Sequence, residues 1–259
     1  MSGIFDTHAH FDDERFDEDR GELLSSLASK GVELVMNCAV NPESIKSTVA
    51  LANEYDFIYA AVGFHPEDLN PLSLADLELV KQTALEEKKV KAIGEIGLDY
   101  YWKEVPREKQ LEFFEAQILL AKELDLPIIV HDREAHEDTY KLLLKHKPKG
   151  VLHCFSGSSE SAKEILKIGM YIGIGGSVTF KNNKKGVKVA ETVPIERILL
   201  ETDAPYMAPV PMRGKRNDSS LIIHVAEKIA EIKGLEPQEV IDICNNNGRK
   251  LFKLARIER

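Results

Sequence analysis

The chain has 259 residues, 43% of them hydrophobic, which is enough for one large domain with a full core, although two small domains would also fit this length. Its formal net charge of −9 argues against a protein that coats duplex nucleic acid with a broad basic face, but not against an enzyme that holds one chain end in a pocket. There is no recognisable linker, signal peptide, membrane-spanning stretch or CxxC pair. We therefore expect a single domain over residues 1–259 in a soluble, cytoplasmic protein, with a monomer as the default.

Eight short apolar runs alternate with amphipathic segments along the chain. The runs, expected to be buried strands, cover residues 3–10, 33–40, 57–64, 90–97, 127–132, 150–156, 170–176 and 197–203. The expected helices cover residues 19–30, 42–55, 73–87, 107–124, 137–147, 159–169, 186–193, 219–234 and 237–255. Eight such units predict an α/β fold, and their number favours a (β/α)8 TIM-like barrel over a doubly wound open sheet.

Metal-binding residue types stand where these runs end. They are His8, His10, His65, Glu95, His131, His153 and Asp203. A single histidine at a strand end is more often a hydrogen-bonded core residue, but burying seven such groups together without a cation would be costly. In a barrel, all strand C-termini surround one pocket, so these residues could meet there. The pattern predicts a divalent-metal site with enough ligands for two ions. The other histidines, His136, His146 and His224, fall within helical patterns and are expected on the surface or in packing contacts.

Strand alternation predicts which neighbours of these ligands share their direction. Residues two apart in a strand point the same way, so Asp6 is expected on the same face as His8 and His10. Cys154 follows His153 directly and is expected to point away from the pocket, into the core.

Other catalytic or anion-binding motifs are weak or missing in the sequence. No Ser–His–Asp set or cysteine nucleophile can be recognised, and the segment 173–177 (GIGGS) lacks the Lys-Ser/Thr of a phosphate-binding P-loop. Basic runs occur at residues 145–149, 181–188 and 213–216, and such runs are more often solvated loops than binding sites.

Seven sequence blocks between residues 6 and 217 resemble the signature blocks of the TatD family of metal-dependent hydrolases. In chain order they are DTHAHF, GFHP, GEIGLDY, HDR, HCFSG, ETDAPY and PMRGKRN. The family's barrel is similar to that of the wider amidohydrolase superfamily. The chain departs from the usual blocks at Phe11, where leucine is frequent, and at Asp218, where glutamate is frequent. Neither position is an expected ligand.

The resemblance implies a site for two divalent cations, with zinc, manganese and magnesium all compatible with the ligand types. It implies that His8, His10 and Asp203 bind the first ion, that His131 and His153 bind the second, and that Glu95 bridges both. Glu95 and Asp203 would be the catalytic carboxylates, with Asp203 taking the proton of the attacking water. Glu201 would orient one of these ligands from behind.

Substrate contacts are expected from residues beside these ligands. His65 would contact substrate phosphate or order the site rather than bind metal. Arg213 and Arg216, in the loop after the last strand, would bind phosphate. The aromatic run 100–102 could stack an unpaired base or form a packing lid. Arg133 could face the pocket or pair with a nearby glutamate.

The predicted activity is a 3′-to-5′ deoxyribonuclease that attacks single-stranded DNA ends with a metal-activated water. The ligand pattern alone indicates metal-assisted hydrolysis, and the resemblance adds nucleic acid as the substrate. The alternative is an ester or amide hydrolase, such as a D-aminoacyl-tRNA deacylase, which would use the same ions. A scaffold with a purely structural metal is disfavoured, because structural sites usually close with four protein ligands and this set could leave positions open.

Overall fold

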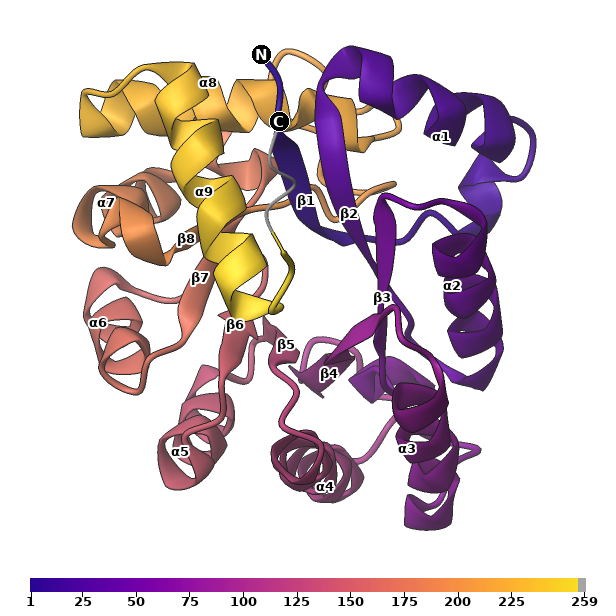
Figure 1. Cartoon of the computed structure of the whole chain (residues 1–259). Helices are drawn as coiled ribbons and strands as arrows, with labels where there is room; N and C mark the ends of the chain where they lie inside the picture. Colours follow the sequence, from indigo (N-terminus) through magenta and orange to yellow (C-terminus); the bar gives the residue numbers. More distant parts are fainter. Residues whose placement is uncertain (256–259) are drawn as a thin grey trace.

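Eight parallel strands form one sheet in the order β1 to β8. The structure is a computed structural model that describes residues 1–255 (Figure 1). The strands are β1 (Ile4–Ala9), β2 (Val32–Cys38), β3 (Ile58–Val62), β4 (Val90–Asp99), β5 (Ile128–Arg133), β6 (Gly150–Leu152), β7 (Tyr171–Ile174) and β8 (Ile198–Leu200). The predicted (β/α)8 barrel is confirmed, whereas the predicted domain boundary at residue 259 lies outside the described residues.

Helices follow the strands and surround them as an outer ring (Figure 1). They are α1 (Arg20–Leu27), α2 (Pro42–Glu54), α3 (Leu77–Glu86), α4 (Arg107–Glu123), α5 (His136–His146), α6 (Ser159–Lys167), α7 (Lys184–Thr192), α8 (Ile222–Lys233) and α9 (Pro237–Leu251). The local sequence determines where several helices begin. Asn41 caps the N-terminus of α2, whose first residue is a proline, and Ser158 caps the N-terminus of α6 in a capping box. Within the described part of the chain, no helix combines the length and hydropathy needed to cross a membrane.

The barrel closes where β8 meets β1. Ala9 and Ala204 form a parallel bridge. The Asp203 amide donates to the His8 carbonyl at 2.9 Å, and the His10 amide donates to the Ala204 carbonyl at 2.8 Å. The closing hydrogen bonds therefore involve the residues just beyond each strand, and they bring the His8–His10 segment beside Asp203.

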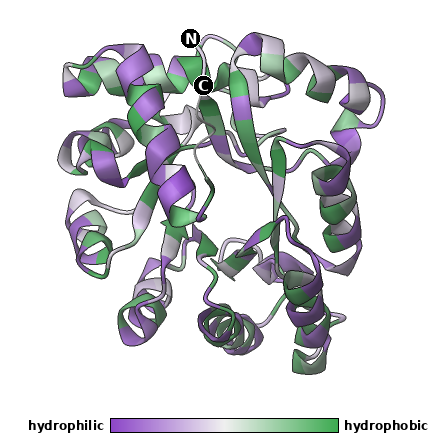
Figure 2. Cartoon of the chain, in the orientation of Figure 1, coloured by the Kyte–Doolittle hydropathy of each residue, from purple (hydrophilic) through white to green (hydrophobic). Residues whose placement is uncertain are grey.

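Two apolar layers hold the barrel together. One fills its interior with residues such as Phe5, Met36, Ile129 and Leu199, taken from strands on all sides. The other lies between the strands and the helices. Figure 2 shows strands that are mostly hydrophobic and helices with both hydrophobic and hydrophilic stripes, as helices that cover a buried sheet require.

Helix α9 packs against the start of β1 and covers one end of the barrel. Phe252, just after α9, lies with its ring 5.9 Å from that of Phe5. Gly248 on α9 is so close to β1 that a Cβ atom there would come within 2.7 Å of the Phe5 ring. Since this helix covers the beginnings of the strands, the open end of the barrel is the one at which the strands finish.

Candidate metal centre

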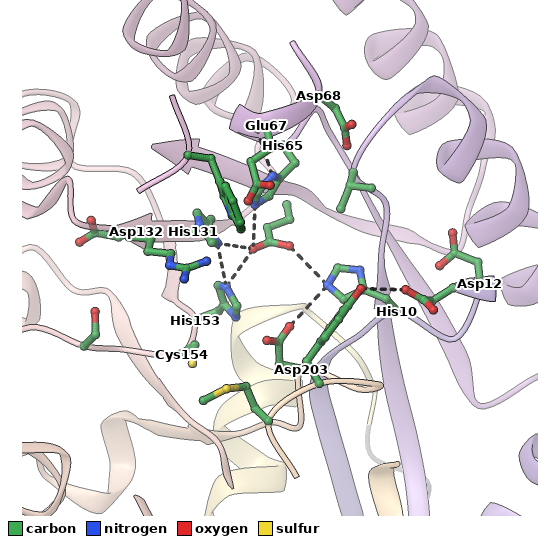
Figure 3. A pocket seen from close by; sticks show the side chains of 18 residues that line it. His10, Asp12, His65, Glu67, Asp68, His131, Asp132, His153, Cys154 and Asp203 are labelled. Carbon is green, nitrogen blue, oxygen red and sulfur yellow. Dashed lines mark hydrogen bonds and ion pairs between the residues drawn. The ribbon is translucent and has the colours of Figure 1, made fainter. Parts of the chain in front are cut away.

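The predicted ligands meet in a pocket of about 800 Å³ at the ends of the strands. Figure 3 shows His10, His131, His153 and Asp203 converging there, each from a different part of the barrel. Glu95, within β4, lies at the centre of the group and is 3% exposed. The barrel topology thus brings together residues that are almost 200 positions apart in the sequence.

One set of ligand atoms surrounds the Oε2 atom of Glu95. The Nε2 atoms of His8 and His10 are 3.0 Å from each other and each 3.4 Å from this oxygen. Asp203 Oδ1 lies 3.7 Å from His8 Nε2 and 3.6 Å from His10 Nε2. Two ligands about 2.1 Å from a tetrahedral ion are about 3.4 Å apart. His8, His10 and Glu95 therefore have the spacing of ligands that share one cation, and Asp203 Oδ1 lies beside both imidazole nitrogens.

A second set surrounds the other oxygen of the same carboxylate. Glu95 Oε1 lies 2.8 Å from His153 Nε2 and 3.0 Å from His131 Nδ1, and these two nitrogens are 3.4 Å apart. His65 Nε2 is 3.7 Å from the same oxygen. Glu95 thus turns one oxygen towards each set, which is the arrangement of a carboxylate that bridges two cations.

The residues present fit divalent cations by their chemistry as well as their spacing. Groups able to hold a metal include His8 with His10 and Glu95, and His65 with Glu95 and His131. Imidazole nitrogens and carboxylate oxygens suit zinc and manganese, while thiolates are missing from both groups. The pocket is open on one side, so water and substrate could reach any ion held there.

The mutual influence of these groups sets their protonation. Burial alone would raise the pKa of the Glu95 carboxyl, but the surrounding imidazoles hold it well below its usual range. Burial lowers the pKa of His8 to about 4, whereas hydrogen bonds to carboxylates outweigh burial at His10 and at His131, whose pKa rises to about 10. Because cations bind neutral imidazole, their binding must release the protons held by the last two rings.

Neighbouring groups fix the orientation of the imidazoles. His10 Nδ1 lies 2.8 Å from the Cys38 carbonyl oxygen, and His131 Nε2 lies 2.9 Å from Asp99 Oδ2. Asp99 is fully buried at the end of β4 and also accepts hydrogen bonds from the amides of Tyr101 and Trp102. Sequence reasoning missed Asp99, although its position four residues after Glu95 places both on one face of an extended strand.

We expect Asp99→Asn to weaken metal binding at the second set by about 10- to 100-fold. The amide can still accept from His131, but it carries no charge to favour the proton on Nε2 and leave Nδ1 free for a cation. Titration of the metal-free protein with manganese would measure the change. Asp138→Asn is the matched control, because that carboxylate accepts from Tyr100 and lies outside both ligand sets. Equal affinity in wild type and Asp99→Asn would contradict the positioning role.

Two expectations from strand alternation are wrong. Asp6 does not join His8 and His10: it is fully buried and accepts hydrogen bonds from the hydroxyls of Thr202 and Ser219. The cause is an irregularity in the pairing of β1 with β2 between residues 6 and 9, which shifts the alternation.

Cys154 lines the pocket instead of pointing into the core. Its φ is +42°, because β6 ends at Leu152 and the chain has already turned. Glu201 is fully buried beside this turn and accepts a hydrogen bond from the Cys154 amide, and burial raises the pKa of its carboxyl to about 8. Its predicted role in orienting a ligand stays a prediction.

Comparison with known proteins agrees with the geometry. A sequence model of the family described as TatD related DNase matches residues 5–253. The chain belongs to the TatD family. Its relatives include "Uncharacterized metal-dependent hydrolase YabD" of Bacillus subtilis (strain 168), which is 42% identical over 97% of this chain and 99% of the relative. The "3'-5' ssDNA/RNA exonuclease TatD" of Rahnella sp. (strain Y9602) is 32% identical over 97% and 99% of the two chains.

The fold is also shared with solved TatD structures. The crystal structure of YjjV, a TatD homologue from Escherichia coli K12, superposes with a TM-score of 0.92 at 33% sequence identity, over 98% of this chain and 99% of that one. Family membership and the names of the relatives establish a metal-dependent hydrolase.

The two arginines predicted to bind substrate lie outside the pocket lining in this TatD-family barrel. Arg216 forms an ion pair with Asp19 at 2.5 Å and donates to the Arg15 carbonyl, so its charge is already neutralised. The guanidinium of Arg213 lies 4.3 Å over the ring of Phe180. Arg133, by contrast, lines the pocket and is the only lysine or arginine among its described lining residues.

The predicted aromatic platform is only partly available. Tyr100 is buried with its hydroxyl donating to Asp138, so it cannot meet substrate. Trp102 lines the pocket and is 45% exposed. Tyr206, which sequence reasoning missed, also lines it and is 42% exposed. The signal that could have revealed Tyr206 is its place three residues after the ligand Asp203.

Proposed function

We propose that this TatD-family hydrolase is a 3′-to-5′ exonuclease that acts on single-stranded DNA ends with two divalent cations. The observation that carries the proposal is the bridging position of Glu95, whose two oxygens face two ligand sets. Two cations on either side of one carboxylate can support both the attacking and the leaving oxygen of a phosphodiester. The printed name of the Rahnella relative supports nucleic acid as the substrate.

Divalent cations at these sets would supply an acidified water as nucleophile and positive charge for the phosphoryl oxygens. The chain itself supplies the proton acceptor. Burial alone would raise the pKa of Asp203, but the hydrogen bond with His10 and the other nearby histidines hold it below its usual value. Asp203 therefore stays ionised, and as a pocket-lining side chain it can accept a proton and return it to the leaving group.

The pocket walls favour an unpaired end. The rings of Trp102 and Tyr206 both line the pocket, although the Arg15 guanidinium lies 4.5 Å over one face of Tyr206. A base can stack on the exposed face of such a ring only when its own face is free. Arg133 offers one guanidinium to a phosphate in the same pocket. A base-paired terminus would have to fray before it could make these contacts.

We expect Trp102→Ala to raise KM for single-stranded DNA by about 5- to 150-fold, because one base–aromatic stack contributes about 1–3 kcal/mol. The kcat should change little, since the ligand sets are untouched. Leu119→Ala is the control: this side chain on α4 is 49% exposed and lies outside the pocket lining that includes Arg133 and Trp102. An effect of equal size in both variants would argue against stacking on Trp102.

The test of the proposed function is product analysis with a 5′-labelled single-stranded DNA. Metal-stripped protein would be re-loaded in turn with magnesium, manganese and zinc. We expect a ladder that shortens from the 3′ end, seen only with metal, and slower cleavage of a duplex of the same sequence. Protein that demonstrably binds two ions yet cleaves no DNA with any of them would contradict the proposal.

One observation favours a second candidate, hydrolysis of an aminoacyl ester. Besides the ligands, the pocket is lined by the carboxylates of Asp12, Asp13, Glu67, Asp68 and Asp132. An acidic wall attracts an ammonium group and repels phosphate. Aminoacyl esters with a free and with an acetylated amino group would separate the two candidates: only an ester hydrolase of this kind should prefer the free amine.

A further inference from the structure

The fold brings together two basic segments that lie far apart in the sequence. They follow β7 and β8, at the end of the barrel where the pocket opens. The Arg213 guanidinium lies 4.3 Å over the Phe180 ring, next to Lys181. The Val210 amide donates to the Thr179 hydroxyl at 2.9 Å, which ties the two loops together. We call the five exposed cations of these loops the basic rim: Lys181, Lys184, Lys185, Arg213 and Lys215.

The charge of this rim is uncompensated. Residues 175–190 and 204–217 hold seven of the chain's 34 lysines and arginines and none of its 43 acidic residues. Within the described part of the chain, no carboxylate forms an ion pair with any of the five rim residues, whereas the flanking Lys188 and Arg216 pair with Glu191 and Asp19. Gathering like charges without partners opposes folding, so in a protein of net charge −9 an anionic ligand is the natural counterpart.

The rim is continuous with the pocket. Tyr206 and Met207, in the loop after β8, line the pocket. The backbone of this loop then packs directly on Gly176, where a Cβ atom would come within 2.0 Å of the Met207 carbonyl oxygen. The same loop reaches Val210 and then Arg213. Tyr206, Met207 and Val210 are all exposed, so an apolar strip leads from the metal centre to the cations. Stacking surface followed by positive charge is the combination that single-stranded nucleic acids require.

We propose that the basic rim binds backbone phosphates of a single strand whose terminal nucleotide occupies the pocket. The proposal rests on the proposed function and extends it, because it gives the path of the strand beyond the cleaved bond. It also assigns different tasks to two surfaces. The acidic pocket with its cations handles one terminal nucleotide, and the rim supplies length-dependent affinity for the rest of the strand.

Lys184→Glu/Lys185→Glu is the variant that tests the rim. Both residues stand in the first turn of α7, where carboxylates interact favourably with the helix N-terminus, so the fold should tolerate the change. Lys141→Glu/Lys163→Glu is the matched control, with the same change in net charge on exposed positions of α5 and α6. Each protein would also carry Asp203→Asn so that the probe survives.

Binding of a fluorescent single-stranded DNA of about 15 nucleotides would be measured between about 50 and 200 mM salt. Loss of two phosphate contacts should lower the slope of log Kd against log salt by about 1.4. Wild-type affinity should therefore fall about sevenfold more than that of the rim variant over this range. The control should keep the wild-type slope, and a trinucleotide, too short to reach the rim, should bind all proteins alike.

Three results would overturn the rim proposal. The first is a salt slope in the rim variant equal to that of wild type, and the second is a control variant whose slope falls as much as that of the rim variant. The third is binding of anionic vesicles or of an acidic protein in preference to the DNA. The outcome is separable from that of the proposed function. If the rim variant without Asp203→Asn cleaves a trinucleotide, the proposed nuclease activity holds even where the rim does not bind DNA. If the protein with an intact Asp203 binds DNA through the rim but cleaves none, the rim proposal holds and the nuclease proposal does not.

Discussion

Replacing Asp203 with asparagine is expected to lower kcat/KM for single-stranded DNA by about 10²- to 10⁴-fold. The amide can still place an oxygen near His8 and His10, but it cannot accept the proton of the attacking water. The loss should appear in kcat more than in KM, because the pocket walls that hold the nucleotide are unchanged. Steady-state kinetics on a labelled oligonucleotide, together with metal content measured on the same samples, would check this.

The control for this prediction is Asp132→Asn. Asp132 also lines the pocket, but it bonds to His136 at 2.7 Å and belongs to neither ligand set. The Asp132→Asn substitution removes one negative charge from the same pocket, as Asp203→Asn does, but leaves every candidate proton acceptor unchanged. If Asp203→Asn bound both ions and still cleaved DNA at the wild-type rate, another group would have to accept the proton. Glu95 would then be the next candidate, since its carboxylate lies between the two sets.

The barrel could be predicted because its signals are local and repeat along the chain. Each buried strand is a short apolar run, each covering helix shows three- and four-residue spacing, and the count of units fixes the closure. The ligands could be found for a related reason. A barrel brings every strand C-terminus to one pocket, so His131 on β5 and His153 after β6 had to be neighbours whatever the details of the loops.

The sequence could not predict the direction of side chains that lie just after a strand or in an irregular part of one. β6 and β8 have only three residues each, so alternation stops before Cys154 and Asp203, both of which have positive φ. The pairing shift in β1 turns Asp6 away from the pocket in the same manner. Alternation describes extended backbone, and it fails where the chain bends into the turns that shape the site.

The sequence also could not predict which side chains from distant segments contact a given residue. The sequence shows that Arg213 and Arg216 follow the last strand, but their neighbours come from distant segments. Arg216 meets Asp19 before α1, whereas Arg213 meets Phe180 after β7. Two arginines three residues apart therefore differ in whether a carboxylate already pairs their positive charge. Only the folded chain shows that one is neutralised and the other belongs to the basic rim.

Removing the cations is expected to lower the free energy of unfolding by about 5 kcal/mol, because a ligand at about 100 times its Kd contributes about 2.7 kcal/mol per site. For a chain of this size the melting temperature should fall by about 10–20 °C. The physical reason is that Glu95 and the imidazoles around it are buried groups arranged to face a positive charge. Thermal unfolding with and without a chelator would measure the difference.

Glu95→Gln separates the effect of the cations from that of the hydrogen bonds around them. Glutamine keeps one oxygen, so it can serve one ligand set, but its amide nitrogen does not bind a cation and cannot serve the other. The stabilisation by metal should therefore fall to half or less, whereas Asp132→Asn should retain it in full. A metal-dependent stabilisation that survives unchanged in Glu95→Gln would mean that the two sets bind their ions independently, and the bridging role of this carboxylate would be wrong.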